Sequence, residues 1–187
     1  MSKIKFRLFV VSFLAIIITF FTQGSLAYYS TVGKATNVVT SGQIKLAIHE
    51  TTDQGTEFPK EGVYIVPGDI VSKVVTVENM NAHPFYLRVK IVYGINSQEL
   101  SAEDCFKLNI NEEYWEYYNG WYYYKDTVQG YETTPYVFSH VEIVGDKVDN
   151  RYIGKTLSLT VDAQAVQSEH NPLPGEHTYE ASGWPKE

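Results

Sequence analysis

The sequence predicts an all-β protein of the β-sandwich type, and three observations carry this prediction. Most segments that look ordered alternate apolar and polar residues with a period of two, which is typical of strands that bury one face. Turn-forming residues separate these segments, and helical periodicity is scarce. Each strand thus has one face for a core and one for solvent, as in two sheets packed face to face within a single domain.

The N-terminus has the three parts of a secretory signal. Basic residues stand between Lys3 and Arg7, an apolar run follows from Leu8 to Phe21, and Ser25 and Ala27 have the spacing that a signal peptidase reads. The alternative is an uncleaved membrane anchor, but the apolar run is shorter than the roughly 20 residues that a spanning helix needs. We therefore expect cleavage after Ala27, a mature chain that begins at Tyr28, and secretion.

Charge and cysteine content restrict the partners of the exported chain. The signal, residues 1–27, holds three of the 15 basic residues and none of the 22 acidic ones, so the remaining 160 residues carry a net charge of −10. An acidic surface disfavours nucleic acid and anionic lipid, which leaves the uncleaved signal as the only expected membrane contact. Cys105 is the single cysteine, so no internal disulfide is expected. Since no base lies nearby in the sequence, we expect a small half-buried residue near Phe106 and Leu108 rather than a nucleophile.

Four runs alternate most clearly and are predicted to be strands of the sandwich domain, residues 28–167. Their expected inward-facing residues are Ile44, Leu46 and Ile48; Val71, Val75 and Val77; Phe85, Leu87, Val89, Ile91 and Tyr93; and Leu157, Leu159, Val161, Ala163 and Ala165. In the third run, Tyr86, Arg88 and Lys90 are expected on the solvent face.

Turn signals separate these runs. Residues 67–69 (Pro-Gly-Asp) predict a turn, residues 79–84 predict a loop, and Gly145 with Asp146 predicts the end of a strand. Residues 97–104 could form one short helix, capped by Ser97 or Ser101.

Residues 113–126 are predicted to form an inserted aromatic β-hairpin. Two strand-like runs meet at Asn119-Gly120, a dipeptide that accepts the positive φ angles of a two-residue hairpin turn. In this register Tyr118 faces Trp121 and Trp115 faces Tyr124. Alternation places Trp115, Tyr117, Tyr122 and Tyr124 on one side of the hairpin, and Tyr114, Tyr118, Trp121 and Tyr123 on the other.

One aromatic face of the hairpin is expected to cover the sandwich core. The other could act in self-association or stack on the sugar rings of a matrix polysaccharide, because Tyr and Trp supply large contact areas at little entropic cost. A role in the core alone is the alternative, but large apolar patches are rarely without function.

The C-terminal segment, residues 168–187, is polar and proline-rich. This composition predicts a mobile tail, with Leu173 or Trp184 as the residues that could pin it.

Three blocks of the sequence, taken together, resemble the TasA–camelysin family of exported bacterial fibre and surface proteins. They are Gly24–Leu46, which spans the signal junction, Val66–Phe85, and Val148–Gln167. The resemblance implies a jelly-roll β-sandwich and processing by a dedicated, SipW-type signal peptidase. It also implies fibres built by donor-strand exchange, in which the mature N-terminal segment of one subunit pairs with a sheet of the next.

The segment that would be donated suits this role. It contains Tyr28, Tyr29, Val32, Val38 and Val39 among Ser, Thr, Gly and Asn, so it can form a strand but is weakly patterned. A strand freed at one end can add to an exposed sheet edge through main-chain hydrogen bonds. The alternative is an ordinary edge strand of a monomeric surface protein.

Catalytic and metal sites are not expected. Camelysin-type proteins have been associated with metalloprotease activity, but no two of the five histidines have the spacing of a zinc-protease helix. Those histidines are His49, His83, His140, His170 and His177. Asp146, Asp149 and Asn150 lack the dense oxygen spacing of a calcium loop and are expected to form a polar turn.

The sequence therefore predicts a secreted, non-enzymatic structural protein of a biofilm matrix or cell surface, without cofactor, that polymerises with itself. A monomeric adhesion or carbohydrate-binding module that uses the hairpin is the alternative, and a secreted hydrolase is a third class.

Overall fold

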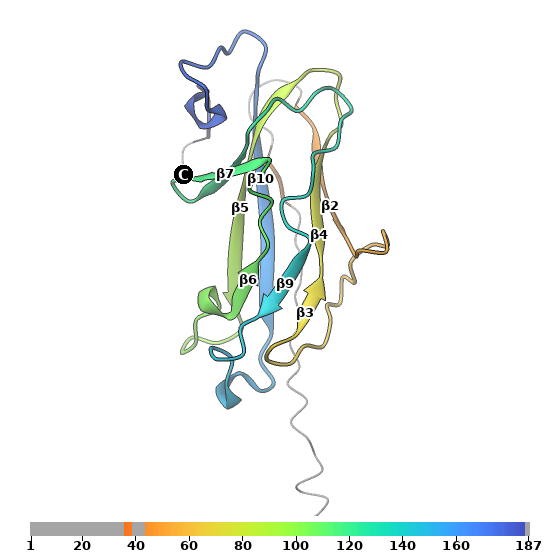
Figure 1. Ribbon diagram of the computed structural model, residues 1–187, viewed down its shortest axis with the longest axis vertical. Helices are drawn as coiled ribbons and strands as arrows, with labels where there is room; N and C mark the ends of the chain where they lie inside the picture. The colour runs from red at the N-terminus through yellow and green to blue at the C-terminus, as the bar shows by residue number, and fades with distance from the viewer. Residues whose placement is uncertain (1–35, 39–43, 186–187) are drawn as a thin grey trace, which may run out of the picture.

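The computed structural model describes residues 36–38 and 44–185 of the chain (Figure 1). Among them are ten β-strands, three single-turn 3-10 helices and no α-helix, which confirms the all-β prediction. The strands are β1 (Thr36–Val38), β2 (Leu46–Thr51), β3 (Ile70–Ser72), β4 (Val74–Asn79), β5 (Phe85–Ile95), β6 (Phe106–Leu108), β7 (Trp115–Tyr118), β8 (Trp121–Tyr124), β9 (His140–Ile143) and β10 (Leu157–Gln167). The 3-10 helices are η1 (Glu103–Cys105), η2 (Asn150–Tyr152) and η3 (Thr178–Glu180).

The first layer is a five-stranded sheet in the order β1-β10-β5-β8-β7. Its centre is the antiparallel pair of β5 and β10, which face each other over the full length of both strands, from Leu157 opposite Ile95 to Gln167 opposite Phe85. The aromatic hairpin, β7 and β8, extends the sheet on one side. On the other side β1 lies parallel to β10 and forms the edge.

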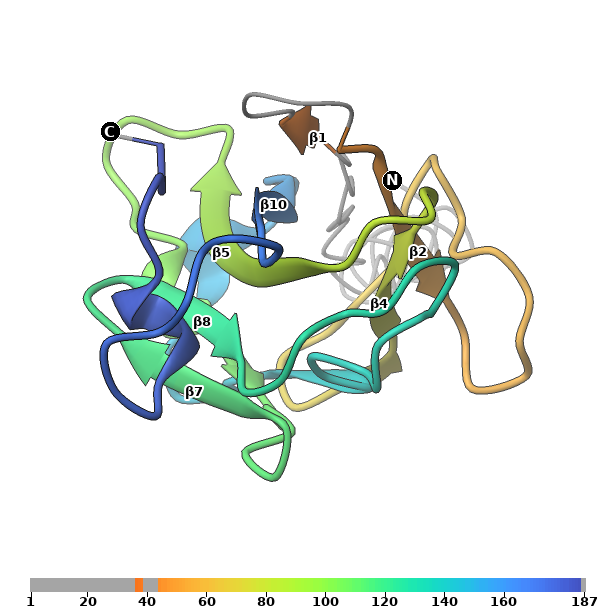
Figure 2. The ribbon, with the colours of Figure 1, turned by 90° about the horizontal axis from the view of Figure 1, so that it is seen from above.

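The second layer combines two small sheets, β2-β4 and β3-β9-β6. Backbone hydrogen bonds join them along the chain that leads into β9: Lys73 N donates to Ser139 O and Val75 N to Phe138 O, both at 3.0 Å. Figures 1 and 2 show this layer facing β5 and β10, so the architecture is sandwich-like.

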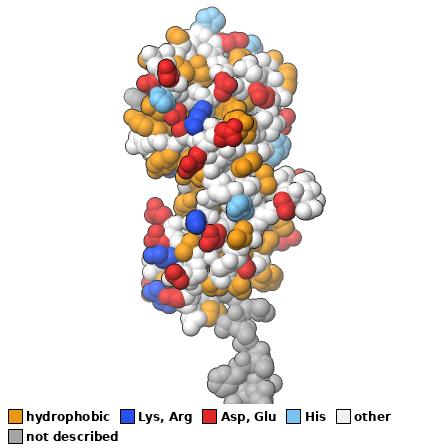
Figure 3. Space-filling model, in the orientation of Figure 1, with side chains coloured by type: hydrophobic (Ala, Val, Ile, Leu, Met, Phe, Trp, Pro, Cys, Tyr) orange, Lys and Arg blue, Asp and Glu red, His pale blue; other side chains and the backbone are white. Residues whose placement is uncertain are grey.

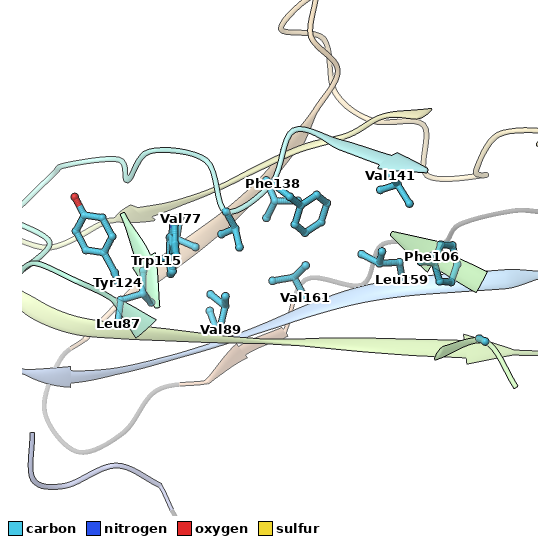
Figure 4. Close-up of a cluster of buried hydrophobic side chains, with 14 of the residues drawn as sticks. Val77, Leu87, Val89, Phe106, Trp115, Tyr124, Phe138, Val141, Leu159 and Val161 are labelled. Atoms are coloured by element: carbon cyan, nitrogen blue, oxygen red, sulfur yellow. The ribbon is translucent and has the colours of Figure 1, made fainter. Parts of the chain in front are cut away.

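The core lies between the layers, and its strand residues are largely those that the alternation predicts (Figure 4). Val75 and Val77 of β4 meet Leu87 and Val89 of β5, and all four are fully buried. The inward residues of β10 are buried in the same way. Four other predicted core residues are only partly buried and pack against the core from its margin: Ile48, Val71, Ile91 and Tyr93. Apolar packing of this extent accounts for a fold without a disulfide.

Two elements differ from the expectation. The run 70–78 is not one strand, because β3 pairs with β9 and β4 pairs with β2, and the partner changes at Lys73. The helix expected over residues 97–104 is reduced to the single turn of η1, in which Ser101 Oγ accepts a hydrogen bond of 3.3 Å from Glu103 N. It ends there because Cys105 turns into the core and Phe106 begins β6.

The predicted turns are confirmed. Gly68 has a φ angle of 92°, and the Asp69 carboxylate closes the turn by accepting a 2.8 Å hydrogen bond from Val66 N. The loop before β5 is fixed by Asn79, whose buried amide donates to three backbone carbonyls, those of His83, Val128 and Gln129.

Candidate functional site

Most of the residues assigned to export and strand donation lie outside the described part of the chain. These are Ser25, Ala27, Tyr28, Tyr29, Val32 and Val39. Val38 is the last residue of β1. No helix within residues 36–38 and 44–185 is long and apolar enough to cross a membrane.

The first candidate site is the edge of the large sheet at β10. There Thr36 pairs with Asp162 and Val38 with Gln164 in a parallel register. The described residues of β1 thus pair with three of the eleven residues of β10, whereas β5 pairs with all eleven. The residues on both sides of β1 lie outside the described part of the chain. A strand edge of this kind presents backbone donors and acceptors that another strand can use.

The second candidate site is the hairpin, whose register agrees with the prediction pair by pair. Trp115 lies opposite Tyr124 and Tyr118 opposite Trp121. The turn residues Asn119 and Gly120 have φ angles of 48° and 86°, as a type I′ turn requires. Because the turn is local and the strands are adjacent, the sequence contains all the information that this register needs.

The two faces of the hairpin have different surroundings. Trp115 and Tyr124 point into the sandwich core, with ring centroids 5.3 Å apart (Figure 4). Tyr122 is partly buried and packs against the same core. Tyr117 lies at the same side but beyond the core, and it is 65% exposed. The prediction that one aromatic face covers the core therefore agrees with the structure.

The opposite face is covered by the chain's own C-terminal tail, which Figure 2 shows lying over β7 and β8. Trp121 and Tyr123 are buried there, together with Tyr86 and Arg88 of β5. We call these four residues the tail seat. The expectation that Tyr86 and Arg88 face solvent is wrong, because the tail removes this face of the sheet from water.

Arg88 is the centre of the tail seat. Its guanidinium carbon lies 4.1 Å from the ring centroid of Trp121 and 4.8 Å from that of Trp184, a residue of the tail. The same guanidinium donates hydrogen bonds to Gln164 Oε1, to the Tyr123 hydroxyl and to Pro185 O. An arginine stacks on aromatic rings and donates several hydrogen bonds at once better than a lysine does, so Arg88 suits the ring and the carbonyl that the tail presents.

The rest of the tail is attached at several points along the hairpin. Tyr179 stacks on Tyr118 with ring centroids 4.1 Å apart, and His177 Nδ1 lies 2.9 Å from Glu116 Oε2. Thr178 is buried and donates a 2.7 Å hydrogen bond to Tyr124 O. Leu173 and Trp184, the two residues expected to pin the tail, pack in a second apolar cluster with Tyr86, Val166 and Ala181. From Thr178 to Trp184 the tail therefore packs against β5 and the hairpin, which the sequence did not lead us to expect.

Covering by the tail changes which aromatic residues of the hairpin are accessible. Tyr117 and Tyr118 are 65% and 50% exposed, and Tyr114 is 38% exposed. Figure 3 shows hydrophobic side chains among acidic ones at the end of the molecule that carries the hairpin and tail. Any contact of the hairpin with a sugar or a partner would use these tyrosines, which lie on both of its faces, rather than Trp121 or Tyr123.

The remaining candidate residues have structural surroundings. Cys105 is fully buried, and burial raises the pKa of its thiol, which disfavours the nucleophilic thiolate. Asp149 caps η2 and pairs with Arg151, as a polar turn would. His49 and His83 each contact one carboxylate, and the described residues contain no group of three potential metal ligands.

Sequence reasoning did not find Arg88 or its contact with the tail. The only signal was the pair of apolar residues Leu173 and Trp184 in an otherwise polar segment. Comparisons with protein-family models, with curated proteins and with solved structures find no match. The TasA–camelysin resemblance and its implications therefore stay predictions.

Proposed function

We propose that this chain is a secreted structural protein of a bacterial cell surface or biofilm matrix. It folds as a jelly roll, is released by a SipW-type signal peptidase, and polymerises by donating its N-terminal strand to the next copy. The observation that supports the proposal is the β10 edge, where β1 lies in a parallel register beside a strand of eleven residues.

The composition of β10 favours strand addition. Natural edge strands are protected by lysine, proline or bulges, because an open edge invites pairing. β10 contains no lysine and no proline, and Asp162 is its only charged residue. A strand from a second copy can pair with such an edge through main-chain hydrogen bonds.

Strand donation of this kind does not close on itself. Each copy has one donor segment and one acceptor edge, so addition is head-to-tail and produces a filament. The net charge of −10 expected after cleavage keeps the subunits dispersed until the specific contact forms.

The test uses residues 28–187 and a variant that begins at residue 41. We expect filaments in electron micrographs of the first and a soluble monomer from the second, with the same far-ultraviolet circular dichroism. The shorter variant keeps the acceptor edge, so in small amounts it should cap growing ends and shorten the filaments. Filaments of the shorter variant alone would refute strand donation.

A peptide of residues 28–41 provides a matched control for the acceptor. It should bind the shorter variant and block capping, whereas a peptide of scrambled sequence should do neither. Binding of both peptides alike would mean that the edge is merely adhesive.

A monomeric adhesion or carbohydrate-binding module is the second candidate, and the exposed rings of Tyr117 and Tyr118 favour it. In that case residues 28–187 stay monomeric and bind a glycan array, and Tyr117→Ala weakens the signal. We expect no protease activity in either case.

A further inference from the structure

The segment that connects β10 to the buried part of the tail, residues 168–177, has the features of a hinge. Beyond Gln167 the chain is mostly exposed until Thr178, where the buried contacts of the tail begin. His170 in this connection has a φ angle of 60°, a left-handed conformation that costs free energy for any residue other than glycine. The bend is held by Asn171, whose side chain bonds to Gln167 O and to both N and Oγ of Ser182.

The contacts of the tail beyond the hinge form one group, and the tail of another copy could make them equally well. They comprise the Arg88–Trp184 stack, the bond from Arg88 to Pro185 O, the Tyr118–Tyr179 stack and the bond from Thr178 to Tyr124 O. All of them join the tail to β5 and the hairpin. A tail from a second copy could make the same contacts, and an extended hinge would release the strain at His170.

We propose that two copies of this chain exchange their C-terminal tails, so that the tail of each copy binds the tail seat of the other. An exchange in which identical elements swap places costs little, because the contacts are those of the monomer, and a strained hinge promotes it. The exchange is reciprocal and closes on itself as a two-fold pair. It would therefore join two filaments side by side, whereas strand donation lengthens one.

The test detects exchange by a disulfide between chains. In residues 28–187, one variant carries Tyr118→Cys and another carries Tyr179→Cys, at the two rings that stack 4.1 Å apart. The variants are mixed at high concentration and oxidised with a glutathione buffer. A disulfide between position 118 of one chain and position 179 of the other, identified by peptide mass, is the expected result.

The matched control replaces Tyr118→Cys by Tyr117→Cys, because residue 117 is more exposed but lies on the other face of the hairpin. It should give at most a small part of the mixed disulfide. Equal yields from positions 117 and 118 would overturn the proposal. They would show that the disulfide forms when chains meet at random, and not because the tail of one chain is bound to the tail seat of the other. A double variant that forms only the disulfide within one chain, at every concentration, would overturn it too.

Two substitutions of His170 should shift the fraction of exchanged chains in opposite directions. His170→Gly removes the strain of the bent hinge and should lower the exchanged fraction about fivefold per hinge. His170→Pro cannot adopt a φ angle of 60° and should raise the exchanged fraction by at least as much. No change in either direction would refute the hinge.

The readout is covalent and is measured under denaturing conditions, so it does not depend on filaments. Exchange that persists in the variant beginning at residue 41 would separate this interface from strand donation. Filaments without the mixed disulfide would leave strand donation intact and refute tail exchange.

Discussion

Lys73 stands where β3 gives way to β4, and its side chain is fully buried. Nζ lies 2.8 Å from Glu50 Oε2 on β2 and 4.3 Å from the ring centroid of Phe58. Burial lowers the pKa of Lys73, and the neighbouring Glu50 carboxylate partly opposes that shift. A buried pair of this kind is costly to desolvate, but it is much more costly to leave half of it in place.

Removal of one partner of this pair should therefore be more harmful than removal of both. We expect Glu50→Ala to lower the free energy of unfolding by about 3–5 kcal/mol, because it leaves an ammonium group buried without its carboxylate. The double variant Glu50→Leu with Lys73→Met should be near the parent stability. Urea unfolding followed by circular dichroism measures both, and an additive loss in the double variant would contradict the argument.

At the scale of elements, the hairpin was predictable because its information is local. Asn119-Gly120 determines the turn, the turn determines the register, and alternation then assigns the faces. The sequence could not decide which face meets the core. That depends on how β8 pairs with β5, where Arg88 lies opposite Tyr123, and on what covers the outer face.

The face that meets the core can be tested by a pair of substitutions in one strand. Trp115 is 1% exposed and Tyr117, two residues later on the same side, is 65% exposed. Trp115→Ala should cost about 3–5 kcal/mol of unfolding free energy, because it leaves a cavity in the core. Tyr117→Ala should stay within about 0.5 kcal/mol of the parent. Similar losses for the two variants would mean that the hairpin is seated differently.

The packing of the tail and the change of strand partner at Lys73 could not be predicted from the sequence, for a different reason. Both depend on contacts between distant residues, and the guanidinium of Arg88 and the carbonyl of Pro185 are 97 positions apart. An arginine at a polar position of an alternating strand is predicted to be exposed to solvent, and a proline-rich polar segment is predicted to be mobile. The usual behaviour of each segment therefore predicts exposure. The contact that buries Arg88 comes from a part of the chain that is distant in the sequence.

At the scale of the whole molecule, the sheet β1-β10-β5-β8-β7 has two covered faces of unlike origin. One face meets the second layer across the main core. The other is covered, near the hairpin, by the tail and its separate cluster of apolar residues. Because the two clusters do not share residues, we expect the sandwich to stay folded when the tail leaves its seat.

This separation makes truncation at Gln167 informative. The shortened chain loses the stack of Trp184 on Arg88 and the bond from Arg88 to Pro185 O, so it should lose at least about 2 kcal/mol of unfolding free energy. It should still unfold cooperatively in urea, since the main core is intact, and it should bind a hydrophobic dye through the uncovered Trp121 and Tyr123. In the full chain, Trp184→Ala should show part of both effects, whereas Tyr131→Ala, at a residue that is 71% exposed, should show neither. A truncated chain without a cooperative transition would mean that tail and sandwich form a single folding unit, because the loss of a merely peripheral cluster cannot melt the core.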